Sequence, residues 1–228
     1  AEVVLGRGGF SEDTAPSHAL VAIPNGEGGW VVAGSLPEAR ALAGKVQGRH
    51  GTTSPEAPLE LPEGDWELTL RTGWVEPAYL ETDASWCEPG GEPFTSLANG
   101  GAFGGKLTTE VGRVARELAY EHRQAVRVVL SREDVVRTGP KRPPIAAGIR
   151  SDGSGVIRVV HTAGIADAIA RVAPQLVVEE VDVVGPPTSV DIRGAGTVEA
   201  QLLIAALEAR KNAQAIDGMT HAVTVTSE

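Results

Sequence analysis

Two kinds of hydrophobic spacing alternate along this chain. Apolar residues in short runs or at every second position predict strands at 18–23, 30–33, 66–71, 126–130, 149–150 paired with 156–160, and 176–184. Apolar residues three and four positions apart predict helices at about 37–46, 108–123, 166–172 and 198–215. Because helices and strands interleave without strict βαβ alternation, the pattern predicts an α+β fold, with mixed sheets and packed helices.

Turn and cap signals divide this pattern into parts. Ser35 and Glu38 have the spacing of a capping box at the start of the first helix. Residues 48–65 carry little apolar content and predict a linker or long surface loop, and residues 84–101 predict a region of turns. We therefore expect two parts: a small N-terminal αβ segment with linker, 1–65, and a larger domain, 66–228.

Composition narrows the class of partner. The 228 residues are 42% hydrophobic and 22% charged, which suits a chain that buries a core. A net charge of −10 argues against nucleic acid or an anionic membrane surface as partner, since both attract basic patches. No stretch approaches the ~20 apolar residues of a membrane span, and no signal peptide is visible, so we expect a cytoplasmic protein.

Cysteine and histidine usage excludes several kinds of site. The single cysteine, Cys87, permits no internal disulfide, no Cys-based zinc site and no iron–sulfur cluster, which takes four thiolates. The five histidines are scattered, without a pair at metal-ligand spacing on one helix. Cys87 as a nucleophile is a weaker interpretation than a buried structural cysteine, because no base stands beside it in the sequence.

The strongest local signal is the glycine loop, residues 99–106 (N-G-G-A-F-G-G-K), directly before the helix expected from Thr108. Glycines let backbone N–H groups approach a ligand, and a helix N-terminus favours an anion. The loop could equally be a tight structural turn. Gly100, Gly105 and Lys106 have P-loop spacing, but Leu107 stands where a P-loop needs a hydroxyl for Mg²⁺.

Three segments together resemble the molybdopterin-binding large subunit of the xanthine dehydrogenase and aldehyde oxidase family, the molybdenum hydroxylases. The glycine loop matches the family's G-G-A-F-G-G-K. The stretch 124–143, which includes T-G-P-K-R-P, resembles the segment that follows that loop, and 192–200 (I-R-G-A-G-T-V-E-A) resembles a later R-G-x-G segment. The segments occur in the family's order and cover about residues 97–217.

The resemblance implies roles for specific residues. It places the backbone around Phe103 and Gly104 against the molybdenum centre, with cofactor-binding residues Gly101, Ala102, Phe103, Gly104, Gly105 and Arg193. Arg193 would also be catalytic, steadying negative charge that develops on the substrate. In this family the metal is held by the pterin and not by protein side chains. Leu107 replaces a glutamate of purine hydroxylases, which disfavours xanthine as the small-molecule substrate.

The resemblance also implies partners, because no segment like the family's G-V-G-E occurs here. We expect a molybdopterin cofactor shared with a partner chain that carries the remaining large-subunit half. Iron–sulfur and flavin groups would lie on other subunits, since this chain holds neither. Two alternatives stay open: a non-catalytic paralogue that acts as a structural or assembly subunit, and, with less support, an unrelated phosphate-binding domain.

Overall fold

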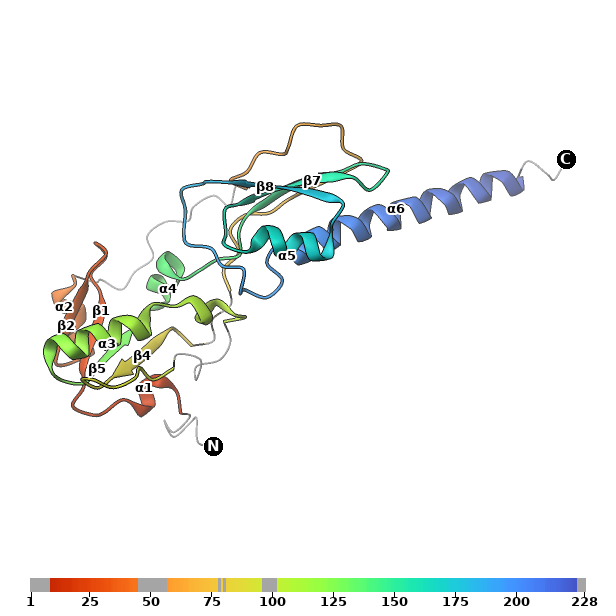
Figure 1. Cartoon of the computed structure of the whole chain (residues 1–228). Coiled ribbons are helices and arrows are strands. Elements are labelled where there is room, and N and C mark those ends of the chain that lie inside the picture. Colours follow the sequence, from red (N-terminus) through yellow and green to blue (C-terminus); the bar gives the residue numbers. More distant parts are fainter. Residues whose placement is uncertain (1–8, 45–56, 78, 80, 96–101, 225–228) are drawn as a thin grey trace. The chain divides into compact units, whose positions relative to one another are not determined.

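The computed structural model describes residues 9–44, 57–77, 79, 81–95 and 102–224, with side chains up to residue 215. The chain forms two compact units that alternate in sequence. The first unit takes Ala1–Thr53 and Glu76–Pro140, and the second takes Ser54–Val75 and Lys141–Glu228. Each unit combines a four-stranded sheet with helices (Figure 1), so the α+β prediction is confirmed.

These units do not coincide with the division expected at residue 65. The strand at 20–24 pairs with the strand at 126–129, so both sequence segments of the first unit are needed to complete its sheet. The strand at 68–71 pairs instead with residues 146–149 of the second unit. Strand pairing therefore joins segments that a linear division of the chain separates.

The sheet of the first unit has the order β2-β1-β5-β4. β1 is antiparallel to β2 and parallel to β5, which is antiparallel to β4. The strands are β1 (Leu20–Pro24), β2 (Trp30–Ala33), β4 (Ala84–Cys87) and β5 (Val126–Val129). β4 lies in the stretch predicted to be turns. The prediction was wrong for these four residues, because so short a segment carries too little pattern and its pairing with β5 makes the strand.

Helices cover both faces of this sheet. The helices are α1 (Ser11–Thr14), α2 (Leu36–Leu42), α3 (Val111–His122) and α4 (Arg132–Thr138). Successive β1 residues face opposite sides: Ala22 packs in the cluster that contains α3, and Val21 and Ile23 pack in the cluster that contains α2. The sequence predicted α2 and α3 but neither α1 nor α4, both of which are short.

The predicted cap of α2 is present in an altered form. The Ser35 hydroxyl accepts a hydrogen bond from the Glu38 backbone N–H at 3.4 Å. The Glu38 carboxylate, however, accepts from the N–H of Gly34 at 3.1 Å. The reciprocal bond of the expected capping box is thus displaced by one residue, while a complete capping box joins Ser131 and Asp134 at the start of α4.

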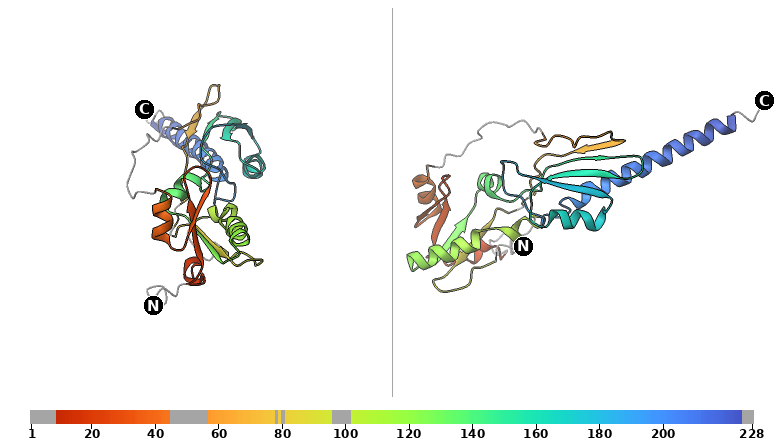
Figure 2. Two further views of the ribbon diagram at one scale, coloured as in Figure 1. Left: turned by 90° about the vertical axis from the view of Figure 1, so that its left-hand side faces the viewer. Right: turned by 45° about the horizontal axis from the view of Figure 1, so that its top comes forward.

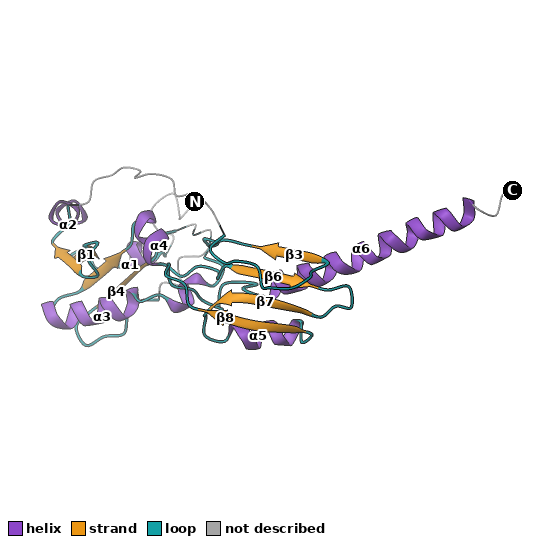
Figure 3. Ribbon diagram, turned by 90° about the horizontal axis from the view of Figure 1, so that it is seen from above, coloured by secondary structure: helices purple, strands orange, loops and turns teal. Residues whose placement is uncertain are grey.

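The sheet of the second unit has the order β3-β6-β7-β8, as seen from above in Figure 3. The strands are β3 (Leu68–Arg71), β6 (Ile145–Ile149), β7 (Gly155–Val160) and β8 (Leu176–Val181). β6 and β7 form the predicted hairpin, with β6 longer at its start than expected. β7 and β8 are parallel and are connected through α5 (Ile165–Val172).

Two helices cover one face of this sheet. Ile145, Ile149 and Ile157 are fully buried against α5 and the first turns of α6 (Thr197–Thr224). The opposite face is covered by Leu59 and the partly buried Trp74. α6 continues beyond the sheet (Figure 2), where its residues from Glu208 to Ala215 are exposed. Within the described part of the chain, no helix is both long enough and apolar enough to cross a membrane.

Candidate functional site

The glycine loop is described from Ala102 onward, and Gly100 and Gly101 lie outside the described residues. Phe103 (φ 45°) and Gly104 (φ 99°) both adopt left-handed backbone conformations. Such a conformation is uncommon for a residue with a side chain and costs about 1–2 kcal/mol. Phe103 is 50% exposed. The tip of the loop is therefore a sharply turned segment whose one large side chain stands half out of the fold.

The base of the loop is fixed against Tyr79. A Cβ atom added to Gly105 would lie 2.8 Å from the Tyr79 hydroxyl oxygen and 3.2 Å from Cγ of Pro77, so this position accommodates glycine alone without rearrangement. Lys106 is only 3% exposed, and its ammonium lies 5.8 Å from the centre of the Tyr79 ring. The loop thus has an open tip and a buried base.

Burial also shifts the pKa values of Lys106 and Tyr79 at the bottom of the loop. Removal from water lowers the pKa of Lys106, while the carboxylates of Asp83 and Glu81 act in the opposite direction. Burial, then Asp83 and Glu76, raises the pKa of Tyr79, so the phenol stays protonated at neutral pH. Both side chains lie at the buried base of the loop.

The loop does not lead directly into a long helix. A short 3₁₀ turn, Gly105–Thr108, follows it, and α3 begins only at Val111. The 3₁₀ turn and two further residues therefore separate the described part of the loop from the N-terminus of α3. Lys106, which a P-loop would direct at phosphates, is buried beside Tyr79. Both observations argue against the phosphate-binding alternative.

Arg193 lies in the second unit, on the turn that leads into α6. The turn is closed by hydrogen bonds from the Ala195 N–H to the Ile192 carbonyl at 2.9 Å and from the Val198 N–H to the Gly194 carbonyl at 3.1 Å. Ile192 is buried, whereas Arg193 is exposed. The buried Ile192 thus anchors the turn in its unit, and Arg193 is exposed at the surface of that unit.

Beneath this turn lies a partly buried ion pair that sequence reasoning missed. Nη2 of Arg142 contacts Oε1 of Glu199 and donates to the Gly194 carbonyl at 3.3 Å. The side chains are 20% and 8% exposed. Burial raises the pKa of Glu199, while backbone N–H groups and Arg142 act in the opposite direction. The available signal was that Arg142 and Glu199 stand in two of the segments that resemble the family.

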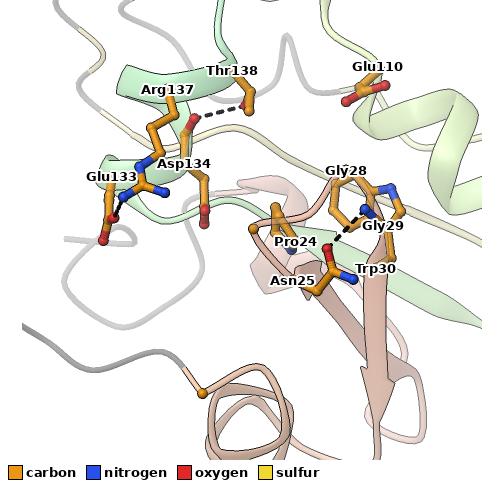
Figure 4. Close-up of a pocket in the computed structure, with 12 residues that line it drawn as sticks. Pro24, Asn25, Gly28, Gly29, Trp30, Glu110, Glu133, Asp134, Arg137 and Thr138 are labelled. Atoms are coloured by element: carbon orange, nitrogen blue, oxygen red, sulfur yellow. Dashed lines mark hydrogen bonds and ion pairs between the residues drawn. The ribbon is translucent and has the colours of Figure 1, made fainter.

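The first unit also contains a pocket of about 430 Å³ (Figure 4). It lies between the glycine-rich turn after β1, the start of α3, and α4. Glu133 and Arg137 of α4 form an ion pair across 2.8 Å at its edge, and Asn25 accepts a hydrogen bond from the Gly29 N–H at 2.9 Å. None of the described site residues predicted from the sequence lines it. The pocket is therefore separate from the glycine loop and from Arg193.

Metal-ligand and nucleophile chemistry find little support in the described residues. No group of three His, Cys, Asp or Glu side chains among them is placed to hold a metal ion. Cys87 is fully buried in β4, and its Sγ lies 3.3 Å from the Glu88 carbonyl oxygen. Burial raises the pKa of this thiol, with Arg116 acting in the opposite direction. The structural interpretation of Cys87 therefore holds better than a nucleophilic one.

The predicted site residues thus belong to two separate units. Ala102, Phe103, Gly104 and Gly105 form the loop of the first unit, and Arg193 lies on the turn of the second. Each group has supporting residues that sequence reasoning did not identify. These are Tyr79 below the loop, and Arg142 with Glu199 below the turn.

No protein-family model and no curated protein matches this sequence. Aldehyde oxidoreductase from Desulfovibrio gigas aligns with 78% of this chain and 30% of its own length, at 16% identity and a TM-score of 0.47. Quinoline 2-oxidoreductase from Pseudomonas putida 86 aligns with 65% of this chain and 27% of its own, at 14% identity and a TM-score of 0.45. The Cu,Mo-CO dehydrogenase aligns with 63% and 27%, at 16% identity and 0.39.

The chain therefore spans less than a third of the length of each of these structures. At identities of 14–16% and TM-scores below 0.5, these alignments assign this chain neither a family nor an activity.

Proposed function

We propose that this chain is a subunit or fragment of a molybdenum hydroxylase that supplies the glycine loop and Arg193 to a molybdopterin site shared with a partner chain. The geometry of the loop is the observation that carries the proposal. Phe103 and Gly104 form a left-handed tip, while Gly105 and Lys106 are fixed against Tyr79. A tip held rigidly from below suits the close approach of a bulky cofactor to the backbone.

The residues present fit such a group. Gly104 has a φ of 99°, which glycine adopts without strain, and it has no side chain to block a ligand. The resemblance assigns this tip of the loop to the metal centre. The cofactor, when bound, supplies hydroxylation of an aldehyde or N-heterocycle with oxygen from water. Ala102 and Gly105 close the base of the loop through a hydrogen bond from the Gly105 N–H to the Ala102 carbonyl at 2.8 Å. The chain's own contribution there is shape, because the backbone at Gly104 allows close approach, while the half-exposed Phe103 side chain stands next to it.

Arg193 contributes charge. Its planar guanidinium can donate two parallel hydrogen bonds to an anionic group. On an exposed turn it can reach a reacting group that develops negative charge, and such electrostatic stabilisation supplies much of the rate enhancement of many enzymes. The class of substrate and the partner chains are also part of this proposal. Leu107 disfavours xanthine as the substrate.

Electrons would leave through partner subunits. The only cysteine is buried, and an iron–sulfur cluster takes four thiolates, so these 228 residues hold none. We therefore propose iron–sulfur and flavin subunits as partners, along with the remaining large-subunit half. Purification of the assembled complex, with measurement of its molybdenum content, tests this arrangement directly.

The decisive variant is Arg193→Ala in the assembled complex. Turnover per molybdenum should fall roughly 10²–10³-fold, because one charge-stabilising donor is lost. Thermal stability should barely change, since exposed side chains contribute little to stability. Arg171→Ala, an exposed arginine on α5 of the same unit, is the matched control and should leave turnover unchanged. Unchanged turnover in the Arg193 variant would instead favour the non-catalytic paralogue.

A further inference from the structure

The buried pair of Arg142 and Glu199 joins two segments that lie 57 residues apart in the sequence. Arg142 precedes β6, and Glu199 is the third residue of α6. Both segments resemble the family, yet the proposed function uses neither side chain. The second unit also has a comparable ion pair, Arg158 with Glu179, in which Nε donates at 3.0 Å and which is more exposed.

The buried pair is a costly way to hold a fold together. Nε of Arg142 and Oε2 of Glu199 are buried and have no hydrogen-bond partner in the described residues. A buried polar atom that lacks a partner loses its hydration without compensation. Apolar residues of similar volume often stabilise a protein at least as well as a buried ion pair. Stability alone therefore gives little reason for this pair.

What the pair does hold is the backbone beside Arg193. The Gly194 carbonyl accepts from Arg142 at 3.3 Å and from the Val198 N–H at 3.1 Å, so two donors fix the carbonyl of the residue that follows Arg193. The backbone of Arg142 is itself fixed, because its backbone N–H donates to the Val75 carbonyl at 3.0 Å. Glu199 in turn restrains the Arg142 guanidinium through their contact.

The turn also has little freedom to shift as a whole. A Cβ on Gly196 would lie 2.8 Å from Cδ1 of Ile165 and 2.9 Å from Cγ1 of Ile169, so the turn packs closely on α5. Packing fixes the side of the turn that faces α5, and the ion pair fixes the carbonyl of Gly194. Together they determine how the Gly194–Ala195 peptide, whose carbonyl belongs to the residue after Arg193, is oriented.

We infer that Arg142 and Glu199 are positioning residues that fix the Gly194–Ala195 peptide, next to Arg193, and thereby direct the Arg193 guanidinium. Neither touches the substrate; both act through Arg193. The catalytic half of this inference rests on the proposed function, whereas the structural half, that the pair holds the turn, stands on the contacts alone. Two measurements separate these halves.

The first measurement is amide hydrogen exchange on the full chain. Arg142→Lys and Glu199→Gln should each speed exchange of the Ala195 and Val198 amides roughly tenfold, the effect of losing about one hydrogen bond. Amides of the β6–β7 hairpin should exchange as before, which would show that the unit remains folded. Arg158→Lys is the matched control and should leave Ala195 and Val198 unchanged. Unchanged exchange at these two amides in both test variants would overturn the inference.

The second measurement is a double-mutant cycle on turnover of the assembled complex. Arg142→Lys should lower kcat per molybdenum about tenfold while molybdenum content holds. In an Arg193→Ala background the same change should cost less than twofold, because a residue that acts through Arg193 has nothing left to position. Fully additive losses would overturn the positioning role. Arg193→Ala without effect would instead overturn the proposed function, and faster exchange would then retain the pair only as the holder of the turn.

Discussion

Gly105→Ala would place a methyl group against the ring that supports the glycine loop. The added Cβ would lie 2.8 Å from the Tyr79 hydroxyl oxygen, a distance that real Cβ atoms essentially never show, and 3.2 Å from Cγ of Pro77. Tyr79 is 7% exposed, and Nη1 of Arg132 donates to its carbonyl at 3.0 Å. The buried ring therefore has little room to move, while the Arg132 bond holds only the Tyr79 backbone.

The cost follows from this contact. Relief requires the hydroxyl to move by about half an ångström or more to reach an ordinary carbon–oxygen separation. Overpacking of this kind in a closely packed region costs about 1–3 kcal/mol. Removing the hydroxyl should remove most of the clash, because the next ring atom, Cζ, lies 3.4 Å from the added Cβ. Tyr79→Phe should therefore recover about 1 kcal/mol or more when combined with Gly105→Ala.

Urea unfolding of the four proteins of this cycle measures the coupling. A loss of 1 kcal/mol corresponds to a fall in Tm of roughly 2–8 °C for domains of this size range, so thermal melts provide a second readout. Gly73→Ala is the control, since its Cβ would meet nothing within 4 Å. A loss of less than about 0.5 kcal/mol in the free energy of unfolding of Gly105→Ala would contradict the predicted clash with Tyr79. A loss that Tyr79→Phe leaves unchanged would contradict it as well.

Three further predictions concern single residues. Burial raises the pKa of Glu199 in the folded state, so ionisation of this carboxyl lowers the stability of the fold. The free energy of unfolding, compared with that of Glu199→Gln, should therefore rise as the pH falls from 7 toward the ordinary glutamate range. A difference that does not change with pH would contradict this. Cys87, buried and with a raised thiol pKa, should resist iodoacetamide at neutral pH until the chain is unfolded in urea; rapid labelling of folded protein would place the thiol at the surface. Gly104→Val should abolish molybdenum retention in the complex, since a β-branched residue is strained at φ 99°; full occupancy would make the loop merely structural.

The sequence predicted those elements that carry their own periodicity. The helix at 111–122 and the hairpin of β6 and β7 each present enough apolar spacing or turn chemistry to be identified without their neighbours. β4 and α4 are four and seven residues long, and their conformations depend on pairing and capping. Short segments of this kind are decided by tertiary contacts that a linear pattern does not contain.

The candidate site was located from its sequence, but its supports were not. The glycine loop and Arg193 occur in recognisable segments, whereas the contact of Tyr79 with Gly105 spans 26 positions that no periodicity links. Lys106 resembled a phosphate ligand because spacing reveals the residue type and not its burial. The pairing of Arg142 with Glu199 likewise requires knowing that the segment before β6 lies beneath the start of α6.

The alternation of the two units along the chain has a consequence for synthesis. β3 leaves the ribosome long before its partner β6, because the second segment of the first unit, Glu76–Pro140, is made in between. At about 5–20 residues per second, β3 waits several seconds with its pairing edge unmatched. During that wait the first unit can complete its own sheet, since β5 precedes β6. Nascent chains stalled at a length at which Pro140 has left the ribosome but Ile145 has not should therefore hold a protease-resistant first unit together with an unpaired β3, a state in which exposed strand edges are open to chaperones.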